Sequence, residues 1–202
     1  MMLLIAGSGV LMCLMVLYSP TMVYGQNPNW TVAQLERFIS ERRVFSFFLL
    51  QLSLLTWVTV RHAYGVLKVK AELAQLRVWS YQGPVWALLV GSVALAIVGF
   101  AAGDLLSIIF SGVGAMTVLG ILRYIHQNQL QPRQWIIEHF TSMIGTGIAL
   151  YTAFFAAGGR RLLAEVLTGQ WQLISWIIAP VMGVSAIMLF KRHFNRKFRV
   201  GS

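Results

Sequence analysis

Charged residues are scarce in this sequence, and cysteine is almost absent. Charged side chains make up 11% of the 202 residues and hydrophobic ones 57%, against about 25% and 45–50% in a typical soluble domain. A soluble fold of this size cannot bury so much apolar surface, which excludes an ordinary cytosolic enzyme and a disordered chain. The single cysteine, Cys13, lies in an apolar run and excludes a disulfide scaffold. The composition predicts an all-α, polytopic membrane protein.

Acidic residues are the scarcest charged type, with six Asp and Glu against sixteen Lys and Arg, a formal charge of +10. Nucleic-acid binding would need a folded basic face, but here the basic residues fall between apolar runs, so we expect no nucleic-acid partner. This pattern is typical of loops that lie beside anionic lipid headgroups on the cytoplasmic side of a membrane.

Six stretches are long and apolar enough to cross the hydrocarbon layer, which takes about 20 residues. They predict a single transmembrane helical domain, followed by a basic tail over 191–202. The predicted spans are residues 2–24, 44–64, 85–102, 105–125, 134–157 and 171–190.

Counting basic residues in the connecting segments predicts the topology. Segments 61–83 and 123–133 and the tail 191–202 hold eleven of the sixteen Lys and Arg, and the segments on the other side hold five. The positive-inside rule therefore predicts that both termini are cytoplasmic. The basic residues expected to face lipid headgroups are Arg61, Lys68, Lys70, Arg123, Lys191 and Arg192.

The first span has a second interpretation as a secretory signal or a truncated start. No Lys or Arg precedes its apolar run, which favours a retained helix. After it, Thr31 and Gln34 have the spacing of a capping box and predict a short interfacial helix. Pro84 is expected in the first turn of the third span, and Asp104 is expected to cap the fourth.

Small residues at intervals of four predict close helix contacts on two faces. The fifth span carries such a face from Gly145 to Ala157, and the fourth carries one from Ser107 to Ala115. Gly112 and Gly114 have no strand before them, so we assign them value only in helix packing.

All four histidines fall on the predicted cytoplasmic side: His62, His126, His139 and His193. Neutral imidazole binds zinc, copper and iron, so these helices could hold a transition metal or a haem-type cofactor. Histidines are also tolerated at membrane interfaces without a ligand. His193 lies in a basic tail, which favours a solvated role.

His139 is the strongest candidate ligand, with His62 or His126 as the second. It follows Glu138 inside a predicted span, where ionisable residues indicate a functional site by default. Met143 is one helical turn on and could be a soft ligand, although packing is the more common role of methionine. Glu138 could be a general acid or base beside a metal-bound water, or could pair with Arg61 or Arg123.

Two stretches, FSFFLLQLSLLTWVTVRHAYGVLKVK from Phe45 and WIIEHFTSMIGTGIALYTAFF from Trp135, resemble helices of a widespread family of uncharacterised bacterial membrane proteins with seven predicted spans. In that family a small-residue-rich helix opens with a histidine, has a methionine a turn later and ends in a Thr-Ala-Phe-like run. His139, Met143 and residues 152–154 occupy those positions. The chain differs by lacking the family's first helix and its histidines. The resemblance implies a multi-span bundle in a bacterial inner membrane and a role for His139.

Three functions follow from these observations. The first is a bundle that binds a metal or haem-type cofactor near the cytoplasmic face through His139 and its neighbours. The second is a non-catalytic accessory or scaffold subunit that docks onto partner membrane subunits. The third is a small-molecule transporter, although no span carries a charge near its middle. The sequence contains no Walker, GxSxG, HExxH or Rossmann motif, and it leaves open whether the protein is an enzyme.

Overall fold

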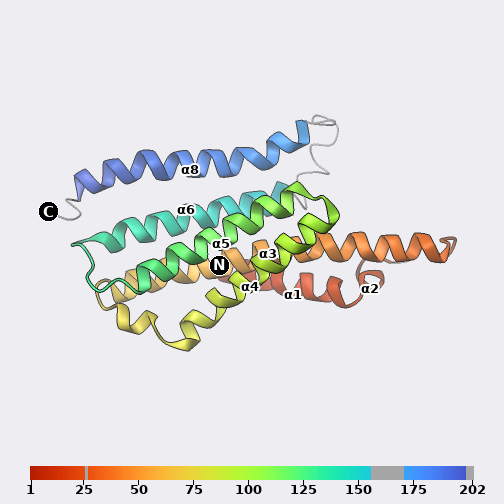
Figure 1. Ribbon diagram of the computed structural model, residues 1–202, viewed down its shortest axis with the longest axis horizontal. Helices are drawn as coiled ribbons and strands as arrows, with labels where there is room; N and C mark the ends of the chain where they lie inside the picture. The colour runs from red at the N-terminus through yellow and green to blue at the C-terminus, as the bar shows by residue number, and fades with distance from the viewer. Residues whose placement is uncertain (26, 156–170, 199–202) are drawn as a thin grey trace.

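The computed structural model describes residues 1–25, 27–155 and 171–198 and confirms an all-α fold (Figure 1). Within these residues the chain forms seven α-helices, one short 3-10 helix and no strand. The elements are α1 (Met2–Tyr18), α2 (Pro20–Tyr24), α3 (Val32–Val69), η1 (Leu73–Leu76), α4 (Trp79–Ala102), α5 (Leu105–Ile125), α6 (Gln134–Phe154) and α8 (Trp171–Lys197).

Three helices, α3, α4 and α5, are long and apolar enough to cross a membrane. Their length and composition indicate a membrane protein, because about 20 apolar residues span the hydrocarbon core. Helix α1 is apolar but has only 17 residues. The full set of six spans stays a prediction.

The predicted first span, residues 2–24, is two helices and not one. Ser19 adopts an extended conformation, with φ −144° and ψ 91°, and Pro20 then begins α2. Proline has no backbone N–H to continue the ladder of the preceding helix, but it fits the first position of a new one. The chain therefore breaks at residue 19.

The short interfacial helix and the second span, predicted separately, form the single 38-residue helix α3. The capping box is confirmed, since the Thr31 hydroxyl accepts from the Gln34 N–H and the Gln34 side chain accepts from the Thr31 N–H. No proline lies between this cap and residue 69, and the 38-residue helix runs for about 57 Å. In Figure 1 it extends beyond the other long helices, with α1 and α2 beside its first half.

Helix α4 begins at Trp79, earlier than the expected residue 85, and Pro84 lies inside the helix and not in its first turn. An internal proline leaves the carbonyl four residues earlier without its helical donor. Here that carbonyl belongs to Ser80, and the Arg61 guanidinium donates to it at 2.8 Å. A side chain of α3 thus replaces the missing bond.

The other helix ends follow the sequence signals more closely. The α5 bounds agree with the prediction, because Gly103 ends α4 with φ +64° and the Asp104 carboxylate accepts from the first N–H groups of α5. Helix α6 begins at Gln134 as expected, and part of its predicted end lies outside the described residues. Helix α8 continues to Lys197, so the start of the predicted tail is helical.

Helix α3 is the centre of the bundle. It packs against α1, α4 and α6, while α5 packs against α4, and α8 lies along α6 (Figure 1). Of the two small-residue faces, Ser107 and Ser111 of α5 are buried, as is Ala149 of α6. An added Cβ at Gly145 would meet no heavy atom within 4 Å, so this part of the α6 face borders open space.

A polar bridge joins α3 to α4 near the middle of the apolar part of α3. The buried Gln51 side chain donates to the Leu88 carbonyl at 3.0 Å and to Ser92 Oγ at 2.7 Å. Gly91 and Gly114 border this bridge, and a Cβ on either would overlap a polar side-chain atom of Gln51 or Ser92. The two glycines let α4 and α5 approach the bridge closely, which is how small residues act in membrane bundles.

Candidate functional site

The candidate site lies at one end of the charge-free part of α3. Residues 44–60 carry no charge, and Arg61 and His62 follow them. Four helices meet here and contribute buried or half-buried polar side chains. We call this group the His62 cluster, formed by His62, Tyr81, Tyr124 and Glu138.

His62 is the central residue of the cluster, and its side chain is only 1% exposed. Its Nδ1 lies 2.7 Å from the Tyr81 hydroxyl, and its Nε2 lies 3.0 Å from Glu138 Oε1. Both ring nitrogens therefore have partners, which a buried imidazole needs. The Glu138 side chain is 24% exposed, so the chain of hydrogen bonds runs from a buried tyrosine to a partly open carboxylate.

Tyr124 closes the cluster from α5. Its ring meets the His62 ring edge to face, with centroids 5.6 Å apart. Its hydroxyl is buried and has no hydrogen-bond partner among the described residues. A buried hydroxyl is usually satisfied by the protein or by an ordered water, so Tyr124 has an unused hydrogen-bonding group beside His62.

Arg61 has a structural role that its sequence position did not predict. Besides its bond to the Ser80 carbonyl, its guanidinium lies over the Tyr81 ring, 5.1 Å from the centroid. Tyr81 is in turn bonded to His62. Arg61 thus holds the tyrosine that orients His62, and its contact with lipid headgroups stays a prediction.

The other candidate histidines are placed differently. His139 is half-buried, and its Nδ1 lies 3.0 Å from the Ala63 carbonyl. A carbonyl only accepts hydrogen bonds, so in neutral His139 the proton is on Nδ1 and the lone pair is on Nε2. His126 is exposed at the C-cap of α5, bonded to the Leu122 carbonyl of its own helix, and His193 is exposed on α8.

No three His, Cys, Asp or Glu side chains come together as metal ligands in the described part of the chain. His62 and Glu138 are joined, but both nitrogens of His62 are already bonded. Met143, for which the sequence favoured packing over a role as a soft ligand, is half-buried on α6. The partner of Glu138 is therefore His62 and not Arg61 or Arg123, the two arginines considered from the sequence.

Glu138 also lines a cavity of about 360 Å³ between four helices. We call it the α5–α6 groove; α3 and α8 complete its walls. It is defined by Thr59, Thr117, Gly120, Glu138, Ser142, Gly145 and Val184. Mostly apolar cavities of this size with a few polar groups are typical of small-molecule sites.

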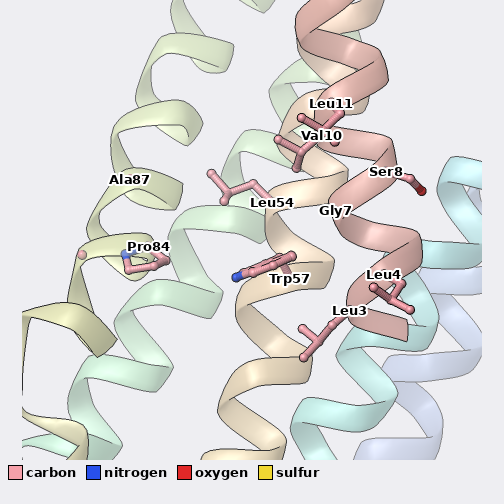
Figure 2. Close-up of a pocket in the computed structure, with 11 residues that line it drawn as sticks. Leu3, Leu4, Gly7, Ser8, Val10, Leu11, Leu54, Trp57, Pro84 and Ala87 are labelled. Carbon is pink, nitrogen blue, oxygen red and sulfur yellow. The ribbon is translucent and has the colours of Figure 1, made fainter. Parts of the chain in front are cut away.

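A larger cavity, of about 860 Å³, lies between α1, α3 and α4 (Figure 2). Leu54 and Trp57 of α3 lie between Leu3 and Val10 of α1 on one side and Pro84 of α4 on the other. None of the described residues that line it is titratable, so this cavity offers packing surface without acid–base chemistry.

No protein-family model, curated protein or solved structure matches this chain. The resemblance to the seven-span bacterial family therefore stays a prediction, and the site has to be interpreted from its own geometry.

Sequence reasoning identified Glu138 and the histidines but missed the tyrosines that complete the cluster. Tyr81 and Tyr124 each lie beside an arginine or tryptophan near a span end, a position typical of interfacial aromatics. The sequence-based prediction also missed Gln51, although a glutamine in the middle of an apolar span indicates interhelical hydrogen bonding.

Proposed function

We propose that this membrane protein binds a small molecule in the α5–α6 groove and exchanges a proton with it at Glu138. One observation carries the proposal: Glu138 is bonded to the buried His62 and at the same time lines the groove. Ionisable residues inside a membrane bundle are characteristic of proton relays and ligand sites. A polar group of a ligand in the groove would therefore meet a carboxylate that is linked to a titratable imidazole.

The His62 cluster can gain a proton without losing a hydrogen bond. With neutral His62, the Tyr81 hydroxyl donates to Nδ1 and the Nε2–H donates to Glu138. With protonated His62, Nδ1–H donates to the Tyr81 oxygen and the bond to Glu138 is kept. The tyrosine hydroxyl permits this because it both donates and accepts. Among the described residues, Glu138 is bonded to His62, which in turn contacts Tyr81 and Tyr124, and Arg61 lies over the Tyr81 ring. Helix α8 brings the apolar Val184 and Ile187 to the groove.

Infrared difference spectroscopy of the purified protein in lipid nanodiscs tests the proposal. Acidification should change the imidazole bands of His62 and shift the carboxylate bands of Glu138, whose bonded partner becomes positively charged. Glu138→Gln should remove the carboxylate shift and alter the imidazole change. Glu72→Gln is the matched control, because Glu72 is exposed and bonded only to Gln75 among the described residues. A Glu138→Gln spectrum identical to that of wild type would contradict the proposal.

We also propose that the protein has six spans in a bacterial inner membrane, with both termini and the His62 cluster on the cytoplasmic side. The bias of basic residues supports this orientation. Lys68, Lys70, Arg123, Lys191 and Arg192 are exposed and would contact anionic headgroups. A fluorescent protein fused to the C-terminus should fluoresce in cells if that end is cytoplasmic, and a periplasmic alkaline phosphatase fused there should be active if it is not.

A second candidate function is metal or haem-type binding through His139. The bond from its Nδ1–H to the Ala63 carbonyl supports it, because ligating histidines commonly donate their other nitrogen to a carbonyl. Further ligands would have to come from a cofactor, a partner subunit or a second copy. Metal analysis and an absorption spectrum of wild type, His139→Ala and the control His193→Ala test it. If the wild-type protein contains no metal and shows no Soret band, the proposal of metal or haem-type binding is wrong.

A further inference from the structure

We infer that the ligand of the α5–α6 groove is a single-chain amphiphile whose head donates hydrogen bonds and carries no negative charge. The inference rests on the proposed function, since it names the class of molecule that would meet Glu138. It follows from three features of the groove: the chemistry of its polar lining, its shape and its open glycines.

The polar lining consists mainly of hydrogen-bond acceptors. The Thr117 hydroxyl donates to the Val113 carbonyl at 2.8 Å, and the Thr59 hydroxyl donates to the Leu55 carbonyl at 2.8 Å. Their protons are used, so the Thr117 oxygen faces other groups only as an acceptor, while the Thr59 oxygen already accepts from Thr146 Oγ1 at 2.9 Å. Glu138, when ionised, is also an acceptor.

The remaining polar side chains do not change this preference. The hydroxyls of Thr141 and Ser142 can turn to donate or accept, and none of the residues found to line the groove is Lys, Arg or His. An anionic head would meet the Glu138 carboxylate, and no residue found to line the groove carries a positive charge to offset the repulsion. An ammonium or hydroxyl head would instead satisfy the free oxygen of that carboxylate.

The shape of the groove fits one extended chain. On α6 its lining runs from Glu138 to Ile148, about 15 Å by the helical rise. Spreading 360 Å³ over this length gives a mean width of about 5 Å, about half the diameter of an α-helix with its side chains, so the groove is narrow. At about 30 Å³ per water-sized group, the volume holds about twelve heavy atoms. The far end is apolar, with Val113, Met116 and Ile148 in its walls.

Two glycines provide the means to block the groove. Gly120 and Gly145 both line it, and a Cβ added to either would meet no heavy atom within 4 Å. The Cβ of a leucine at these positions would meet no neighbour, and the rest of its side chain is expected to occupy part of the groove. Gly112 on α5 and Gly147 on α6 are equally open but do not line the groove, so they are matched controls.

The test measures binding of dodecylamine, dodecanol and dodecanoate to the detergent-solubilised protein by native mass spectrometry. Dodecylamine and dodecanol should bind with one molecule per chain, and ionised dodecanoate about tenfold more weakly or not at all. Gly120→Leu and Gly145→Leu should weaken binding at least about tenfold, and Gly112→Leu and Gly147→Leu should not. Thermal unfolding of each variant confirms that it is folded.

Equal binding of dodecanoate, or binding unaffected by both groove variants, would overturn the inference. Absence of binding by all three probes would also overturn it. The proposed function fails separately, if the infrared change does not depend on Glu138. A Glu138-dependent infrared change without amphiphile binding would leave a proton-exchanging site whose ligand is of another class.

Discussion

Gly114 lies where α5 passes the polar bridge between Gln51 and Ser92, and the structure leaves no room there for a side chain. An added Cβ would overlap Ser92 Oγ and lie 3.2 Å from Gln51 Nε2. Ser92 can avoid the overlap only by rotating its hydroxyl away. That rotation would break its bond to the Leu88 carbonyl at 2.8 Å and the bond from Gln51 at 2.7 Å.

The expected cost of Gly114→Ala follows from these two bonds. Side-chain hydrogen bonds in membrane bundles average about 0.6 kcal/mol and reach about 1.7 kcal/mol, so losing two costs about 1–3 kcal/mol. The greater helix propensity of alanine returns at most about 1 kcal/mol. We therefore expect Gly114→Ala to be about 1–3 kcal/mol less stable than Gly112→Ala, which has the same propensity gain. At Gly112 no heavy atom lies within 4 Å of an added Cβ, so Gly112→Ala should be neutral or stabilising.

Equilibrium unfolding in mixed detergent micelles, followed by circular dichroism, measures these differences. The Ser92→Ala background provides a double-mutant cycle, because it removes the atom that an alanine at 114 would overlap. Gly114→Ala should cost less in that background than in wild type. Equal stabilities of Gly114→Ala and Gly112→Ala, or additive losses in the cycle, would refute the reasoning.

The same assay tests the hydrogen bonds of the His62 cluster and its support. His62→Ala should lower the free energy of unfolding by about 2–4 kcal/mol, because it leaves Tyr81 and Glu138 without their hydrogen-bond partner. His126 is exposed, so His126→Ala should change that free energy by no more than about 0.5 kcal/mol. Similar losses for the two variants would contradict the buried position of His62. Arg61→Ala should cost about 0.5–1.5 kcal/mol, because it removes the side-chain donor of the Ser80 carbonyl. In a Pro84→Ala background, which restores a backbone N–H, this loss should fall by at least about half. An unchanged loss would show that Arg61 does not replace the missing helical bond.

The sequence predicted helix type and several boundaries well because those depend on local chemistry. The α5 bounds were predictable from Gly103 and Asp104, whose conformation and side chain end one helix and begin the next. The α4 start was not predictable from Pro84, since an internal proline is tolerated only when another group satisfies the freed carbonyl. That group, Arg61, lies 23 positions earlier on another helix.

The site was predictable only to the level of a membrane face. Residue spacing placed His62 and Glu138 near the same end of the bundle, but their pairing depends on how α3 and α6 are rotated about their axes. That rotation is fixed by packing along both helices, including the bond from Thr146 to Thr59 at 2.9 Å. How two helices are rotated against each other is a tertiary property that residue spacing does not give. The sequence therefore suggested Arg61 or Arg123 as ion-pair partners of Glu138, and not His62.

The two histidines that face this end of the bundle differ in the chemistry that their partners allow. The partner of His139 Nδ1 is a carbonyl, which can only accept, so neutral His139 has one tautomer, with its lone pair on Nε2. The partner of His62 Nδ1 is a hydroxyl, which can reverse its role when the ring is protonated. His139 is therefore suited to ligation and His62 to proton exchange. Because Glu138 is bonded to His62 and lines the α5–α6 groove, the exchangeable proton of the His62 cluster lies next to this groove.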